Sequence, residues 1–158
     1  MAEVIILIGR IASGKTHYVK EVKKDRKLML LSCDDLILTL FDDCLGDKHR
    51  EIENRCYTFL FGQAEQLIDM GIDVALDFGF WTAQSRANAR EYFKERGIKT
   101  KAIYFNPPKD VRESRLVKRN KILSNSTRRE FIIEPPLLEK LDARFEEPTS
   151  EEYDYVIV

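Results

Sequence analysis

The stretch from Gly9 to Thr16 reads GRIASGKT, with four residues between its two glycines and a lysine and a threonine directly after the second glycine. An apolar run from Val4 to Ile8 precedes it and suits a strand buried on both faces of a parallel sheet, while the segment 15–25 after it reads as a helix. In a strand, loop and helix of this kind, backbone N–H groups and the helix N-terminus surround phosphate oxygens. The spacing therefore predicts a phosphate-binding loop in an α/β protein.

Two side chains of this loop have an expected chemical role. Lys15 is placed to reach the β- and γ-phosphates of a nucleotide, and the hydroxyl of Thr16 is placed to hold Mg²⁺. A loop of this kind serves switches, motors and kinases alike. The residues at the ends of the other strands must therefore decide between them.

Strand-like and helix-like segments alternate along the rest of the chain, which is typical of an α/β fold with a parallel sheet and helices on both faces, in three layers. Thr82 is expected to cap one helix and Gly97 to close it. A length of 158 residues predicts a single domain over 1–158. Residues 122–134 have weak periodicity and predict a loop or mobile flap. The expected strands cover 4–8, 28–31, 72–76, 101–105 and 155–158, and the expected helices cover 15–25, 48–70, 82–96, 107–120 and 137–145.

Composition narrows the class of partner. The chain holds 26 basic and 27 acidic residues, so no overall field draws it to nucleic acid or to a membrane surface. Its three cysteines lack CxxC spacing and are accompanied by only two histidines, which argues against a disulfide framework or a zinc site. No apolar run approaches membrane-spanning length, and the N-terminus has no signal-peptide layout. We expect a cytoplasmic protein with reduced thiols.

Carboxylates follow two of the predicted strands. Asp34 and Asp35 come after the second strand, and Asp77 ends the third. Ligands of open α/β sheets bind at the carboxyl ends of the strands, so these side chains are expected near Lys15. One carboxylate there can steady a metal ion and another can accept a proton from a hydroxyl nucleophile. The alternatives are that Asp34 caps the following helix and that Asp77 is only a turn residue.

The most basic segment lies in the predicted helix 107–120 and just beyond it. Arg115 and Arg119 are one turn apart, so they share a face and could act together on a polyphosphate. For Arg112, Lys118 and Lys121, a solvated helix face is an equally good interpretation.

Aromatic residues follow Asp77 at the same edge. Phe78, Phe80 and Trp81 could line the pocket of an acceptor, and Arg86, one turn into the next helix, could face it. The alternatives are that the aromatic side chains pack the helix against the sheet and that Arg86 lies on the surface.

Four stretches, GRIASGKT, LLSCDD, VALDFGFWTAQSR and SRLVKRN, occur in an order that resembles the AAA-type predicted-kinase group of small P-loop kinases. These are related to polynucleotide 5′-hydroxyl kinase, zeta toxin, chloramphenicol phosphotransferase and gluconate kinase. The resemblance implies a P-loop NTPase fold of the nucleotide-kinase type, with a five-stranded parallel sheet in the order 2-3-1-4-5. It also implies ATP and Mg²⁺ as cofactors.

Carried over residue by residue, the resemblance makes Asp34 the general base and places Asp77 on the metal side with Thr16. Arg119 looks like a lid arginine that folds over the transferring phosphate, and Arg115 would lie near the adenine or the phosphates. The nucleotide-binding residues implied are Gly9, Arg10, Ile11, Ala12, Ser13, Gly14, Lys15, Thr16, His17 and Arg115.

Other parts of the resemblance concern the lid and the acceptor. A basic lid would cover about 115–134, and the loop 145–152 would border the adenine pocket. Polynucleotide kinases have an arginine three residues after the catalytic aspartate to grip the phosphate of the acceptor, and this chain has Ile37 there. The acceptor segments of chloramphenicol and gluconate kinases have no match in 38–51.

We therefore expect a kinase that transfers the γ-phosphoryl group of ATP to a hydroxyl of a small molecule, with Lys15, Asp34 and Arg119 as its catalytic residues. The acceptor would lie near Asp35, Phe80, Trp81 and Arg86. One alternative is a nucleotide-binding regulatory ATPase without an acceptor. Another is a nucleic-acid 5′-hydroxyl kinase, which the basic segment favours and Ile37 disfavours.

Overall fold

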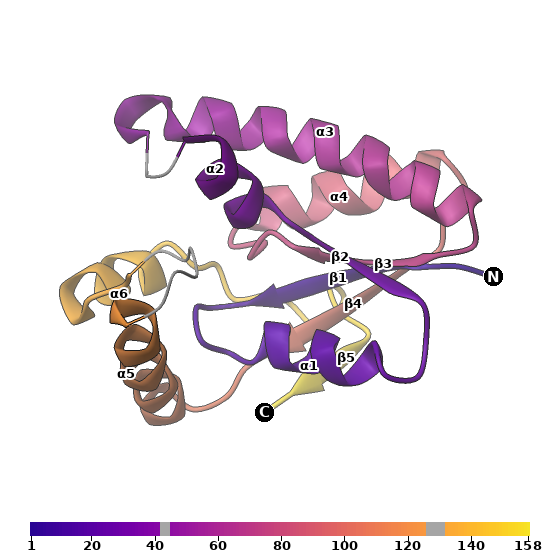
Figure 1. The fold of residues 1–158 in the computed structure, drawn as a ribbon. Helices are drawn as coiled ribbons and strands as arrows, with labels where there is room; N and C mark the ends of the chain where they lie inside the picture. The colour runs from indigo at the N-terminus through magenta and orange to yellow at the C-terminus, as the bar shows by residue number, and fades with distance from the viewer. Residues whose placement is uncertain (42–44, 126–131) are drawn as a thin grey trace.

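The computed structural model describes residues 1–41, 45–125 and 132–158 (Figure 1). Within these ranges, strands and helices follow one another in mostly alternating order, as the sequence predicts. The strands are β1 (Val4–Gly9), β2 (Leu28–Ser32), β3 (Asp73–Asp77), β4 (Thr100–Phe105) and β5 (Tyr155–Ile157). The helices are α1 (Lys15–Val22), α2 (Cys33–Phe41), the 3-10 helix η1 (Gly46–Lys48), α3 (His49–Asp69), α4 (Ala83–Glu95), α5 (Lys109–Ser124) and α6 (Pro135–Asp142).

The five strands form one parallel sheet in the order β2-β3-β1-β4-β5. The order that the resemblance implies is therefore confirmed. Across neighbouring strands Ser32 is the register partner of Asp77, and Gly9 is the partner of Phe105. The ends of β1, β2 and β3 thus meet at the carboxyl edge of the sheet, where open α/β folds bind their ligands.

Side chains of the central strand β1 alternate between two cores. Val4 and Ile6 belong to the core that β1 forms with α2, α3 and α4, whereas Ile5 and Leu7 pack with Val19 of α1 on the other face. Figure 1 shows α3 and α4 on one side of the sheet and α1 on the other. Each of the four β1 side chains is at most 1% exposed, which explains why the run is apolar without alternation.

The helices α5 and α6 lie together beside the carboxyl edge (Figure 1). A small apolar cluster is formed by Leu116 of α5, by Ile133 just before α6 and by Leu138 of α6. Ile11 and Ala12 of the phosphate loop pack against this cluster. Leu116 and Ile133, which lie near the two ends of the segment expected to act as a lid, therefore pack close to the phosphate loop.

Helix α2 begins directly after β2. The hydroxyl of Ser32 accepts a hydrogen bond from the N–H of Asp35 at 3.2 Å, so Ser32 serves as the cap. Asp34 lies inside the first turn, and the alternative interpretation of Asp34 as the cap is wrong. Helix α5 runs to Ser124, past the expected end at Asn120, while residues 126–131 of the expected flap lie outside the described residues.

Two predicted helix boundaries are confirmed. Thr82 and Ser85 exchange hydrogen bonds as a capping box at the start of α4, and Gly97 follows the helix with φ +66°. Nowhere in the described ranges is a helix both long and apolar enough to cross a bilayer. Cys33 and Cys56 are buried free thiols, and Cys44 lies outside the described residues.

Candidate active site

The loop between β1 and α1 has a backbone shape that leaves donors for a ligand. Ala12 and Gly14 have φ +59° and +104°, and Gly14 precedes α1 without any side-chain cap. A Cβ on Gly9 would lie 2.7 Å from the hydroxyl oxygen of Ser13 and 2.9 Å from the carbonyl oxygen of Phe105, so only glycine fits there. Gly14 has no side chain to cap α1, so the first N–H groups of the helix are available to an anion.

Lys15 closes this loop on itself. Its Nζ donates to the carbonyl oxygens of Gly9 and Arg10, each at 3.0 Å, and to the hydroxyl of Ser13 at 3.4 Å. Burial lowers the pKa of Lys15, and the negative charges of Asp77 and Asp34 oppose that shift. The ammonium group is thus held at the phosphate loop, within electrostatic reach of both predicted carboxylates.

Asp34 is the most strongly perturbed carboxylate of the site. It is exposed at the rim, yet the surrounding protein removes much of its hydration, and Asp77 and Glu53 add negative charge. Together these effects raise the pKa of Asp34 to about 6, against the opposing charges of Lys15 and His49. A carboxyl group with such a pKa is suited to exchange protons near neutral pH.

We expect the carboxyl group of Asp34 to titrate near pH 6 in the free protein, and Asp77→Asn to move its midpoint to lower pH by removing a like charge. NMR of the metal-free and nucleotide-free protein measures both midpoints. The folded protein binds this proton more tightly than the unfolded chain does, because the ordinary pKa of an aspartate side chain is 3.8. The contribution of Asp34 to the free energy of unfolding is therefore complete below about pH 4 and is lost as the pH rises through about 6.

Glu51→Gln is the matched control for this titration, because Glu51 is an exposed carboxylate on the same helix as Glu53 and pairs with Arg55. It should leave the midpoint of Asp34 unchanged. A midpoint near 4 in the wild-type protein would contradict the electrostatic arrangement of the site.

Two residues near Asp34 were not predicted from the sequence. His49 and Glu53 lie one turn apart at the start of α3, and both contribute to the electrostatic environment of Asp34. Tyr57, one turn further, stacks on Phe78 at 4.7 Å between ring centroids and donates to its carbonyl oxygen at 3.3 Å. The four-residue spacing was visible in the sequence, but only the fold shows that this face of α3 reaches the carboxyl edge.

The two arginines predicted to act on phosphates lie near the loop. Arg115 Nη1 donates to the carbonyl oxygen of Ala12 at 3.5 Å. Arg119 lowers the pKa of Lys15 by repulsion, so its positive charge is close to the ammonium group. Arg112, by contrast, is buried and donates to both carboxylate oxygens of Asp142, at 3.1 and 2.8 Å. Its interpretation as part of a solvated helix face is wrong, since it fastens α6 to α5.

The predicted acceptor residues separate into two groups. Asp35 is exposed on α2, and Trp81 is partly buried in the turn after β3. Phe80 and Arg86 are only 2% and 1% exposed, so neither offers an open face to an acceptor. The structure gives Arg86 a buried network of partners instead, and its interpretation as a surface residue is wrong.

The remaining predicted nucleotide-binding residues differ in where their side chains lie. Thr16 and His17 are exposed in the first turn of α1, at the mouth of the loop. Arg10 contributes its backbone to the loop, whereas its guanidinium group lies over the ring of Phe145, 4.4 Å from the centroid, and pairs with Glu147.

Solved structures share this fold over nearly the whole chain. APS kinase CysC of Mycobacterium tuberculosis, solved with AMPPNP and APS, has a TM-score of 0.67 and 21% identity, and the match covers 99% of this chain and 87% of that one. A putative kinase from Chloroflexus aurantiacus has a TM-score of 0.71 and 18% identity, with coverage of 99% and 83%. A chain of the Pnkp1/Rnl/Hen1 RNA repair complex has a TM-score of 0.68 and 18% identity, with coverage of 90% and 43%.

These neighbours establish a kinase-like P-loop fold, in agreement with the small AAA-type kinase group that the sequence resembles. No curated protein sequence matches the chain significantly. One family profile, described as an AAA domain, matches residues 4–148 and so includes the phosphate loop, both strand-end carboxylates and α5. The chain therefore belongs to the AAA domain family.

Proposed function

We propose that the protein is an ATP- and Mg²⁺-dependent phosphotransferase that moves the γ-phosphoryl group to a hydroxyl of a small molecule. One observation carries the proposal. Lys15 of the phosphate loop lies within electrostatic reach of Asp34, Asp77 and Arg119, so that a cation, a raised-pKa carboxylate and a second carboxylate converge at one edge of the sheet. The single-domain architecture with a basic lid over about 115–134 is part of this proposal.

The residues present fit a nucleotide with a magnesium ion. The uncapped start of α1 and the left-handed Gly14 supply N–H donors for phosphate oxygens. The hydroxyl of Thr16 and the carboxylate of Asp77 are hard oxygen donors, which Mg²⁺ prefers together with water and phosphate oxygens. When bound, Mg²⁺ would neutralise charge that develops on the phosphates. The neighbour solved with AMPPNP, a stable ATP analogue, supports ATP as the nucleotide.

In the proposed reaction, Asp34 accepts the proton of the acceptor hydroxyl as the hydroxyl oxygen bonds to the γ-phosphorus. The bond between the γ-phosphorus and the β,γ-bridging oxygen breaks, and ADP leaves with the electron pair. Lys15 and Arg119 offset the negative charge on the transferring group and its leaving group. Arg115, which already contacts the loop, would hold the nucleotide.

The acceptor side favours a hydroxyl compound without a phosphate of its own. Ile37 stands where polynucleotide kinases carry an arginine for the phosphate of the acceptor, and it is fully buried in the core. Asp77 and Glu53 add negative charge beside Asp34, which repels an anionic acceptor.

ATP turnover should rise with one or more compounds from a panel of nucleosides, sugars and hydroxyl-bearing antibiotics, and labelled phosphate should appear on the compound. The assay is ADP release at fixed ATP and Mg²⁺, followed by mass spectrometry of the product. If ADP release is slow and no compound raises it, the protein is better described as a nucleotide-binding regulatory ATPase, and the proposal fails.

A nucleic-acid 5′-hydroxyl kinase is the second candidate, because Lys118 and Lys121 are exposed on α5, the helix that carries Arg115. The likeness to a chain of an RNA repair complex supports testing it. The same panel therefore includes 5′-hydroxyl oligonucleotides of RNA and DNA. Transfer to their ends, with none to the small molecules, would favour this candidate.

A further inference from the structure

The turn between β3 and α4 has an unusual backbone conformation. Gly79 has φ +75°, and Phe80 follows with φ +49°, in the left-handed region that bulky residues rarely adopt. The N–H of Gly9 in the phosphate loop donates to the carbonyl oxygen of Gly79 at 3.4 Å. Because Asp77 lies directly before this turn, the turn helps to set where Asp77 stands relative to the loop. Such strain persists only where surrounding contacts hold it.

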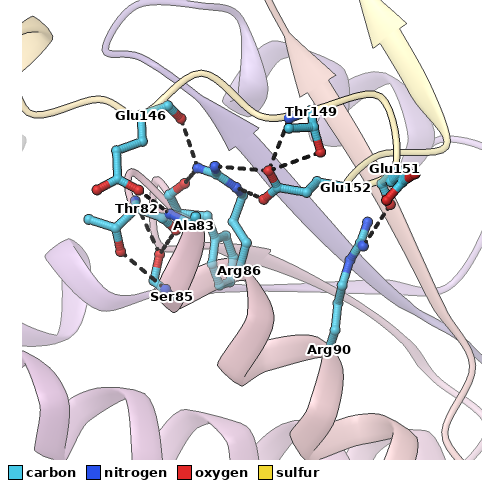
Figure 2. Close-up of polar contacts among 10 residues, drawn as sticks. Thr82, Ala83, Ser85, Arg86, Arg90, Glu146, Thr149, Glu151 and Glu152 are labelled. Atoms are coloured by element: carbon cyan, nitrogen blue, oxygen red, sulfur yellow. Dashed lines mark hydrogen bonds and ion pairs between the residues drawn. The ribbon is translucent and has the colours of Figure 1, made fainter.

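One buried arginine provides those contacts. Arg86 of α4 is 1% exposed, and its Nη1 donates to the carbonyl oxygens of Phe80 and Glu146, each at 3.0 Å. Its Nε and Nη2 donate to the carboxylate of Glu152 (Figure 2). This hydrogen bonding lowers the pKa of Glu152, which keeps the carboxylate ionised. A buried guanidinium group with four such contacts has one orientation available to it.

Two partners of Arg86, Glu146 and Glu152, come from a segment far along the chain, residues 146–152, which we name the C-terminal strap. The N–H of Glu146 donates to the carbonyl oxygen of Trp81 at 2.8 Å, and its carboxylate accepts from the N–H of Ala83 at 2.7 Å. Figure 2 shows Glu146 and Glu152 of the strap on either side of the Arg86 guanidinium group. The strap is thus fixed to the β3–α4 turn through Glu146 and to Arg86 of α4 through Glu152.

The same strap also holds the phosphate loop. Glu147 pairs with Arg10 and accepts a hydrogen bond from the hydroxyl of Tyr104, so it lies between β4 and the start of the loop. The strap therefore touches the nucleotide side of the site through Glu147 and the acceptor side through Glu146. Arg86 is the side chain that fastens it.

We propose that Arg86 is a positioning residue, which holds the left-handed β3–α4 turn and the C-terminal strap in one arrangement so that Asp77 and the phosphate loop keep their relative places. The inference rests on the proposed function in one respect, since it takes this edge of the sheet as the place of turnover. Arg86 itself touches neither the nucleotide nor the acceptor in this account.

Trp81 makes the proposal directly measurable, because it is the chain's single tryptophan and lies in the turn itself. The lead variant is Glu152→Gln, which keeps the shape of the side chain but removes the charge that pairs with Arg86. We expect the Trp81 emission of the folded variant to shift to longer wavelength. Turnover should fall by about tenfold, as for a sub-ångström misplacement of reacting groups, while nucleotide affinity changes less than about twofold.

Glu151→Gln is the matched control, since it makes the same charge change on the same strap. Among the described residues, Glu151 contributes only its backbone carbonyl, which accepts from Arg90 at 2.9 Å, so wild-type emission and turnover are expected. Arg86→Lys keeps the charge but loses the planar fork, and should reproduce the effects of Glu152→Gln. If Arg86→Lys does not fold, Glu152→Gln alone decides.

A merely structural role would lower the melting temperature and leave emission and turnover of the folded protein unchanged, and that result in Glu152→Gln would overturn the inference. The outcome is separable from that of the proposed function. If the wild-type protein phosphorylates no compound, the proposed function fails, whereas a shift in Trp81 emission confined to the Arg86 and Glu152 variants still supports the positioning role.

Discussion

Lys15→Ala should lower the turnover of phosphotransfer by at least about a hundredfold, because one cationic contact to charge that develops in a pre-organised site often supplies about 3 kcal/mol of barrier reduction. In the free protein the Nζ group is held by the carbonyl oxygens of Gly9 and Arg10, directly at the mouth of the loop. ADP release with the best acceptor of the panel measures turnover, and calorimetry measures nucleotide affinity, which should also fall.

Lys20→Ala is the matched control, since Lys20 is exposed on the same helix and the charge change is the same. It should leave turnover unchanged. Wild-type turnover in Lys15→Ala would contradict the proposed function of the loop.

The parts of this site that could be predicted from sequence depend on short-range order. The glycines and Lys15 of the loop lie within eight residues, and the positive φ of Gly14 is one that glycine adopts at little steric cost. The central strands could also be predicted, since a strand that is covered on both faces appears in the sequence as an apolar run without alternation. The positions of Asp34 and Asp77 near Lys15 could be predicted because the carboxyl ends of parallel strands lie at one edge of the sheet.

The bounds of helix α2 could not be predicted, because its sequence carries signals for both a strand and a helix. Its sequence, CDDLILTLF, is short and rich in apolar residues, which suits a buried strand as well as a helix. Asp34 and Ser32 both qualify as caps, and only the hydrogen bond from the N–H of Asp35 decides between them. The decision matters for function, because it leaves the carboxylate of Asp34 facing the site instead of the helix N-terminus.

The burial of two arginines could not be predicted from a single sequence. Arg86 and Arg112 were expected on the surface or at a pocket, since arginine is almost never fully buried without a partner. Their partners, Glu152 and Asp142, stand 66 and 30 positions away, and no local pattern links them. His49 and Glu53 were missed for the same reason: their spacing is helical, but their nearness to Asp34 is tertiary.

Asp34→Asn should lower turnover by at least about a hundredfold, which is the usual contribution of a positioned general base. Nucleotide affinity should stay the same or increase, because the substitution removes a negative charge that lies near Asp77 and the phosphate loop. The same ADP-release assay and calorimetry measure the two quantities. This pattern, with transfer lost and binding kept, separates a general base from a residue that holds the nucleotide.

Glu51→Gln provides the control, because Glu51 is exposed on α3, the helix that carries Glu53, and its substitution removes the same charge away from the acceptor residues. It should retain most of the turnover. The pH dependence adds an independent test, since a general base must be ionised: wild-type turnover should fall on the acidic side of the titration of Asp34, and the remaining turnover of Asp34→Asn should not follow that limb. Full transfer by Asp34→Asn to an identified acceptor would show that another group takes the proton, and Glu53, which lies beside Asp34, would become the residue to replace next.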